Sequence, residues 1–236
     1  MTEVVVTSDL PGATTELFIE ALAGAAAARG RAAVALTGGS TAPPLYPRLR
    51  AAPVPWSKTH VFFTDERAVP PDHELSNYRL AEEGLLRHVQ VAAVHRMQGE
   101  AGDLDAEARR CSQDLRGTLG TPPRLDLMVL GLGPDGHVCS LFAGVPSSAD
   151  RSDREPVWHV ASPLQVKPEV ERLTMVPFLI VTARMVVLQV SGAAKAEVLA
   201  RALKGPEDLV GCPAQWLRKA TGRAVVVCDP AAASGL

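Results

Sequence analysis

The chain has 236 residues, 47% of them hydrophobic and 21% charged, and its formal net charge is −2. This balance predicts one globular domain spanning residues 1–236, and it argues against nucleic acid as a partner. The N-terminus lacks a signal-peptide pattern and no apolar run reaches the length of a membrane span, so we expect a cytoplasmic protein without membrane contact.

Short β-branched segments alternate with longer segments of helical period along the chain. The expected strands are residues 4–7, 32–37, 60–64, 125–131, 185–190 and 224–228. The expected helices are residues 14–29, 76–89, 104–119, 193–203 and 213–220. This alternation predicts an α/β fold with a doubly wound, mostly parallel sheet flanked by helices. Residues 51–56, 69–71 and 144–156 are expected to be surface loops.

Ligands of open parallel sheets gather at the carboxyl ends of the strands, so the residues after each strand carry the functional signal. The strand at 32–37 runs into Gly38, Gly39, Ser40 and Thr41. Two glycines allow a sharp turn whose N–H groups and neighbouring hydroxyls can surround an anion. This segment is a candidate phosphate site, and the alternative is a plain turn with Ser40 or Thr41 as a helix cap.

Three consecutive charges, Asp65, Glu66 and Arg67, follow the strand at 60–64. Such a triplet is costly to bury unless its members pair with one another or with a ligand. Asp65 and Arg67 are therefore candidate substrate-binding residues. The alternative is a solvated loop, because charged triplets are common on protein surfaces.

The strand at 125–131 leads into GLGPDGH, residues 131–137. This segment matches the GxGxxG pattern of dinucleotide sites, but a pyrophosphate bound there would lie beside the Asp135 carboxylate. A carboxylate and an imidazole two residues apart, Asp135 and His137, are better suited to proton transfer. The alternative is that Asp135 caps a helix and His137 is structural.

Neither a metal site nor a thiol nucleophile is indicated. The six histidines show no HxH or HExxH spacing, and the four cysteines form no CxxC pair. Cys139 lies near His137, but the apolar context VCSLF is typical of a packed thiol. We expect no metal and no organic cofactor.

Lys195 is a further candidate for binding an anion. It follows the strand at 185–190 and the Ser191-Gly192 pair, at the expected start of a helix. A cation in the first turn of a helix opposes the helix dipole, which favours an anion bound nearby.

Five segments together resemble the 6-phosphogluconolactonase family. They are GGST (38–41), TDERAVPPDHELSNYRL (64–80), DLMVLGLGPDGHVCSLFAG (126–144), ERLT (171–174) and SGAAKAEVL (191–199). Their order and spacing are similar to that family across nearly the whole chain. The resemblance implies a Rossmann-like α/β fold of the sugar-phosphate isomerase type, and hydrolysis of 6-phosphoglucono-δ-lactone to 6-phosphogluconate.

The same resemblance implies roles for individual residues. His137 would be the general acid/base, Asp135 its partner and Arg67 a substrate-binding residue. The phosphate would be held by Gly39, Ser40, Arg172 and Lys195. The expected partner is a small phosphorylated sugar lactone, with no metal or cofactor, and we expect the protein to be a monomer.

Three other functions stay open at this point. A deaminase or isomerase on the same scaffold would use an acid such as Asp65 to abstract a proton beside a carbonyl. A non-catalytic sugar-phosphate sensor would keep the phosphate loops alone. A Rossmann dehydrogenase would bind NAD(H).

Overall fold

The computed structural model describes residues 2–145, 155–161 and 167–236. Most of the loop expected at residues 144–156 therefore lies outside the described residues. Within the described part of the chain, no helix combines the length and the apolar character needed to cross a bilayer.

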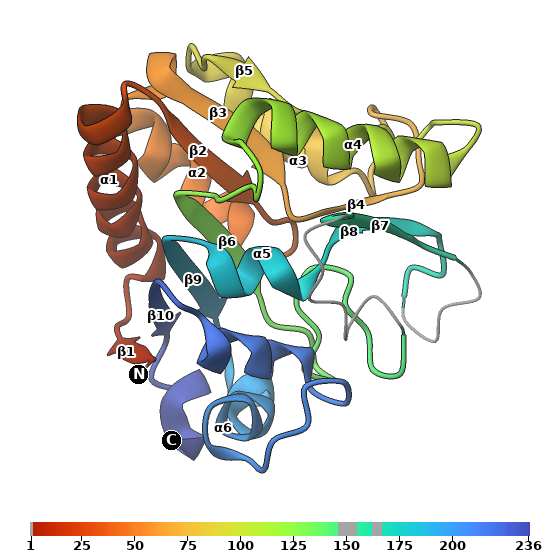
Figure 1. The fold of residues 1–236 in the computed structure, drawn as a ribbon. Helices are drawn as coiled ribbons and strands as arrows, with labels where there is room; N and C mark the ends of the chain where they lie inside the picture. Colours follow the sequence, from red (N-terminus) through yellow and green to blue (C-terminus); the bar gives the residue numbers. More distant parts are fainter. Residues whose placement is uncertain (1, 146–154, 162–166) are drawn as a thin grey trace.

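Seven parallel strands form the main sheet, in the order β1-β10-β9-β6-β2-β3-β5 (Figure 1). They are Glu3–Val6 (β1), Ala32–Leu36 (β2), Thr59–Phe63 (β3), Ala93–Val94 (β5), Leu127–Gly131 (β6), Met185–Val190 (β9) and Arg223–Cys228 (β10). Every residue of β2 and β9 is buried, as required when helices cover both faces of a sheet. The predicted α/β class and parallel sheet are confirmed.

Helices pack on both faces of this sheet and create two hydrophobic cores (Figure 1). They are Leu10–Arg29 (α1), Ala42–Ala51 (α2), Asn77–Gly84 (α3), Leu104–Leu119 (α4), Pro177–Thr182 (α5) and Ala196–Lys204 (α6). Side chains of α1, α2 and α3 share one core with the sheet, and side chains of α4, α5 and α6 share the other. Short 3₁₀ segments are Trp56–Lys58, Leu86–His88, Ala193–Lys195, Pro213–Lys219 and Ala232–Gly235.

A small antiparallel sheet, absent from the sequence-based prediction, lies beside the main one. Its order is β4-β8-β7, with the bounds Asp65–Arg67 (β4), Arg172–Met175 (β8) and Val157–Val160 (β7). Thr64 connects the two sheets, because its N–H donates to Leu36 O and its carbonyl accepts from Met175 N. The charged triplet is therefore a strand, not the solvated loop that was the alternative.

Several predicted elements differ from the observed ones. A helix start was expected after the Gly38–Thr41 turn, but no helix range was given there; the structure has α2, with Pro43 and Pro44 in its first turn, where a missing N–H costs nothing. The helix expected at 76–89 ends at Gly84 and continues only as a 3₁₀ turn. The segment Pro213–Lys219 is a 3₁₀ helix.

Candidate active site

The carboxyl ends of the central strands surround a cleft of about 220 Å³. Seven of the nine site residues expected from the sequence line it: Gly39, Ser40, Thr41, Asp65, Arg67, His137 and Lys195. They come from segments that follow β2, β3, β6 and β9, as the rule for open parallel sheets predicts. The other two, Asp135 and Arg172, lie behind this lining.

His137 and Asp135 form a directly hydrogen-bonded pair. The Nδ1 atom of His137 lies 2.6 Å from Asp135 Oδ1, and the His137 backbone N–H also donates to that oxygen, at 3.2 Å. Burial alone would raise the pKa of Asp135, but these hydrogen bonds outweigh it and lower the pKa to about 2. Asp135 is therefore ionised and can only accept, so Nδ1 carries a proton, and in the neutral imidazole the lone pair is on Nε2. The pair can accept a proton at Nε2.

Glycines let the loop wrap closely around the imidazole. A Cβ atom at Gly133 would lie 2.1 Å from His137 Nδ1, and Gly133 N donates to His137 O at 2.8 Å. Gly136 has a φ of +97°, and its carbonyl accepts from Ala214 N at 2.8 Å. Arg201 donates to the carbonyl of Asp135. The ring is thus held by the backbone of its own loop and by contacts from the C-terminal segments.

The Gly38–Thr41 segment offers donors without much help from the helix after it. Gly39 has a φ of +83°, which is the left-handed conformation that favours glycine. The prolines at positions 43 and 44 carry no N–H, so the first turn of α2 presents few amide donors to an anion. Donors for a phosphate must come from the loop amides, from the hydroxyls of Ser40 and Thr41, and from cations.

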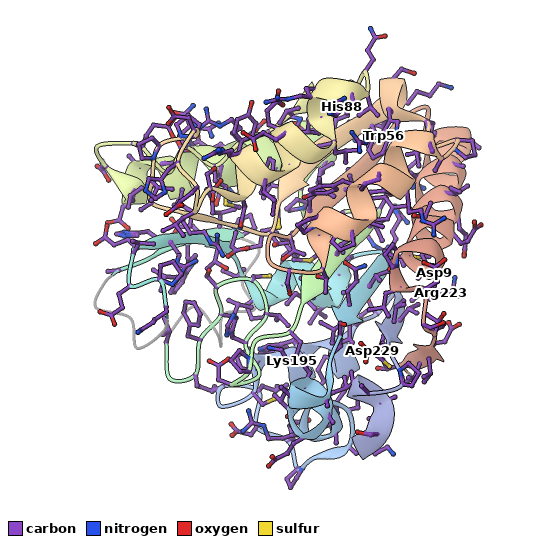
Figure 2. The ribbon with its side chains drawn as sticks, turned by 180° about the vertical axis from the view of Figure 1, so that it is seen from behind. Asp9, Trp56, His88, Lys195, Arg223 and Asp229 are labelled. Carbon is purple, nitrogen blue, oxygen red and sulfur yellow. The ribbon has the colours of Figure 1, made fainter. Side chains whose placement is uncertain are left out.

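Lys195 supplies one such cation. It ends the 3₁₀ turn Ala193–Lys195, and Asp229 fixes the approach to that turn by accepting from Ser191 Oγ at 2.6 Å and Gly192 N at 2.8 Å (Figure 2). Burial lowers the pKa of Lys195, whereas the charge of Asp135 acts in the opposite direction. The ammonium group therefore lies within electrostatic reach of the proton-transfer pair.

Arg67 and Arg172 stand directly opposite each other in the small sheet. Arg67 lines the cleft and donates to Leu75 O at 2.5 Å. Arg172 is buried and donates to Val170 O at 3.1 Å and Pro168 O at 2.9 Å, so it lies behind the cleft lining. Burial, and next the charge of Arg67, lower the pKa of Arg172. This wall therefore carries two guanidinium groups, and the carboxylates of Asp65 and Glu66 lie close enough to Arg172 to oppose the effect of Arg67 on its pKa.

Cys139 lines the cleft as a buried residue, and burial raises the pKa of its thiol well above the ordinary value. A neutral buried thiol fits the predicted packing role better than a nucleophilic one. In the part of the chain that the structure describes, no three His, Cys, Asp or Glu side chains gather in a way that could hold a metal ion.

Asn77 and Gln189 are polar residues of the cleft that were not among the expected site residues. Asn77 begins α3 and Gln189 lies near the end of β9. Gln189 was detectable in principle, because it is the single polar residue of the strand MVVLQV; its Nε2 donates to Thr14 Oγ1 of α1 at 2.9 Å. Asn77 belongs to the segment at 64–80 that carried the resemblance, but no spacing argument pointed to its side chain.

A family model described as glucosamine-6-phosphate isomerases/6-phosphogluconolactonase matches residues 7–226. The chain belongs to this family. Among its relatives, the 6-phosphogluconolactonase of Mycobacterium tuberculosis is 38% identical over 216 residues, which cover 87% of this chain and 85% of that protein. The resemblance seen in the sequence is thereby confirmed.

Solved structures show the same family fold. The 6-phosphogluconolactonase from Trypanosoma brucei has a TM-score of 0.86 at 26% identity, over 100% of this chain and 99% of that one. A monomeric glucosamine-6-phosphate deaminase has a TM-score of 0.84 at 21% identity, over 100% of both chains. The second likeness concerns the fold alone, so the two activities must be separated by the chemistry of the cleft.

Proposed function

We propose that this chain hydrolyses 6-phosphoglucono-δ-lactone to 6-phosphogluconate, with His137 as general acid/base and Asp135 as its partner. The observation that carries the proposal is the His137–Asp135 pair, held at 2.6 Å in a cleft that also contains Lys195 and the glycine-rich loop. The names of the relatives point to the same substrate.

In the proposed reaction, His137 Nε2 removes a proton from a water molecule while the water oxygen attacks the lactone carbonyl carbon. Asp135 stabilises the resulting imidazolium through Nδ1. Negative charge develops on the carbonyl oxygen, where Arg67 or backbone N–H groups of the cleft can donate. When the tetrahedral intermediate collapses, the bond to the ring oxygen breaks, and His137 returns its proton to that oxygen. Neither a metal nor an organic cofactor takes part in this scheme.

The phosphate end of the substrate would lie against Gly39, Ser40 and Thr41, with the charge of Lys195 beside it. Arg172 stays a prediction for this site; it would add positive charge from behind Arg67. Phosphate binding energy that is used to orient the lactone raises kcat as well as affinity.

The state of Asp65 favours lactone hydrolysis over the deaminase reaction. Its carboxylate accepts from Ser140 Oγ at 2.7 Å, and also from Thr64 Oγ1 at 3.2 Å and Asn77 Nδ2 at 3.3 Å. These donors occupy three of the roughly four lone-pair sites of the carboxylate, and this engagement within the protein is the observation that favours the lactonase.

The deciding experiment measures hydrolysis of freshly generated 6-phosphoglucono-δ-lactone, with and without protein, against the spontaneous reaction. We expect a clear acceleration, and no release of ammonia or formation of a ketose from glucosamine 6-phosphate. No acceleration, with ammonia or a ketose formed instead, would replace the lactonase by a deaminase. The single domain, the cytoplasmic location and the monomer stay predictions; light scattering tests the last.

A further inference from the structure

We propose that Asp65 is a positioning residue that joins the phosphate loop to the His137 loop, through Asn77 on one side and Ser140 on the other. Under this proposal, the His137–Asp135 pair is already correctly positioned when a ligand binds to the glycine-rich loop. The inference rests on the proposed lactonase reaction, and it changes the expected role of Asp65 from substrate contact to support of the site.

The contact with Ser140 ties Asp65 to the His137 loop. Ser140 Oγ donates to Asp65 Oδ2 at 2.7 Å, and the Ser140 backbone N–H donates to Thr174 Oγ1 at 3.1 Å. The Ser140 side chain is 0% exposed, so water cannot replace either partner. Since Ser140 comes three residues after His137, these two bonds fix the far end of the loop that carries the imidazole.

The turn between His137 and Ser140 needs such support. Cys139 has a φ of +53°, a left-handed conformation that is unfavourable for a residue with a side chain. Leu141 N donates to Val138 O at 3.0 Å, which closes the turn around Cys139. A strained residue of this kind persists only where its surroundings hold it, and the bonds of Ser140 supply that hold.

Asn77 connects Asp65 to the phosphate loop. Its Nδ2 donates to the Asp65 carbonyl at 2.9 Å and to Asp65 Oδ1 at 3.3 Å. Its Oδ1 lies against the Gly38 backbone, where a Cβ atom would be only 1.9 Å away. The Asn77 side chain is thus in contact with Asp65 through hydrogen bonds and with Gly38 through packing.

The three side chains form one buried chain across the floor of the cleft. Asn77 is 2% exposed, Asp65 is 5% exposed and Ser140 is fully buried. The donors Ser140 Oγ and Asn77 Nδ2 are both satisfied by Asp65, so moving either one would leave a buried donor without a partner. Among the described residues, Asn77 Oδ1 has no hydrogen-bond partner and is held by packing against Gly38. A displacement of the His137 loop would therefore break the bond to Asp65, and a displacement of Asp65 would disturb Gly38.

The test is Ser140→Ala, measured as kcat for 6-phosphoglucono-δ-lactone and, separately, as Kd for 6-phosphogluconate. If Asp65 positions the loop, kcat falls by roughly tenfold, because small misplacements of catalytic groups are costly. The Kd stays within about twofold, because Ser140 does not touch the phosphate loop. If Ser140 contributed only to the stability of the fold, Ser140→Ala would not lower kcat while leaving Kd unchanged.

Ser112 offers a matched control. It is 1% exposed, and its hydroxyl accepts from Val157 N at 3.1 Å and donates to Val157 O at 3.4 Å, away from the cleft. Ser112→Ala should lower the melting temperature as Ser140→Ala does, while leaving kcat and Kd unchanged.

Asn77→Ala provides the second arm, and it replaces Ser140→Ala if that variant does not fold. It should also lower kcat by roughly tenfold, and the double variant should lose little more than either single one, since both changes break the same chain. Unchanged kcat in both single variants, or full multiplication of their effects, would overturn the inference. A wild-type protein without lactonase activity would instead overturn the proposed function.

Discussion

Gly133→Ala should displace the His137 imidazole from its catalytic position without changing its chemistry. A Cβ atom at this position would lie 2.1 Å from Nδ1 and 2.2 Å from Cε1 of His137, far inside the normal contact distance. The φ of Gly133 is not in the left-handed region, so the backbone itself accepts alanine. The ring must therefore move by more than an ångström, and it must break the 2.6 Å bond to Asp135.

The expected loss follows from the role of the pair. General acid–base catalysis contributes typically about 10²–10⁴-fold, so kcat/KM should fall by about two orders of magnitude or more. The melting temperature should change by only a few degrees, because His137 lies at the cleft and can turn toward it. Gly24→Ala is the control: it lies in α1 with no atom within 4 Å of the added Cβ, and it should leave activity unchanged.

The assay compares kcat/KM for 6-phosphoglucono-δ-lactone in Gly133→Ala, His137→Ala and the double variant. If alanine at 133 acts by displacing the ring, it should add almost nothing once the ring is gone. Retention of kcat/KM within about threefold in Gly133→Ala would refute this reasoning. The reasoning would also be refuted if Gly133→Ala lowered kcat/KM by the same factor in the wild type and in the His137→Ala background.

The other predictions use the same lactone assay or simple unfolding measurements. His137→Ala should abolish most lactonase activity in a folded protein, and Asp135→Asn should lower it through lost orientation; near-normal turnover of His137→Ala would contradict the assignment. Lys195→Ala should weaken 6-phosphogluconate binding by about 1.5–3 kcal/mol and narrow the preference for phosphorylated over unphosphorylated lactone. Arg172→Ala should weaken that binding less, because Arg172 lies behind the cleft lining and its guanidinium donates to backbone carbonyls. Asp135, with its pKa lowered from 3.8 to about 2, stabilises the fold above pH 4 and loses this contribution as the pH falls toward 2. Fully realised, that change is worth about 2.4 kcal/mol, and the 39% exposure of the side chain reduces it to about 1 kcal/mol; urea unfolding at pH 2–5 should show it in the wild type and show a smaller effect in His137→Ala, where only backbone donors to Asp135 remain. Activity should survive exhaustive treatment with a chelator, and recovery only on added zinc or magnesium would count against a metal-free reaction.

The main sheet and most of the cleft were predictable from local patterns. Buried segments such as residues 32–36 and 185–190 are apolar throughout, and a parallel sheet brings the residues that follow them to one edge. That rule placed Gly39, His137 and Lys195 together although they are far apart in the sequence. The location of these residues in the cleft thus followed from their positions directly after predicted parallel strands.

The small sheet and the support of the site were not predictable in this way. Each of its strands is three or four residues long, and β4 consists of three charged residues, which are unfavourable in a strand. The Glu66 carboxylate is accommodated there by donors from residues 76–78, namely Ser76 Oγ, Asn77 N and Tyr78 N. Two of the side-chain partners of Asp65, Asn77 and Ser140, are 12 and 75 residues away along the chain. Contacts over such separations depend on the finished fold, and no local periodicity reports them.

The position of Thr64 between the two sheets has a consequence for the entropy of binding. This one residue hydrogen-bonds to β2 through its N–H and to the end of β8 through its carbonyl, which ties the strand carrying Arg67 to the strand that leads into the glycine-rich loop. The backbone of this wall therefore loses its conformational entropy when the protein folds, and not when a ligand binds. A ligand that enters the cleft therefore does not have to order the backbone of that wall, and the cost that remains on the protein side is that of its side chains.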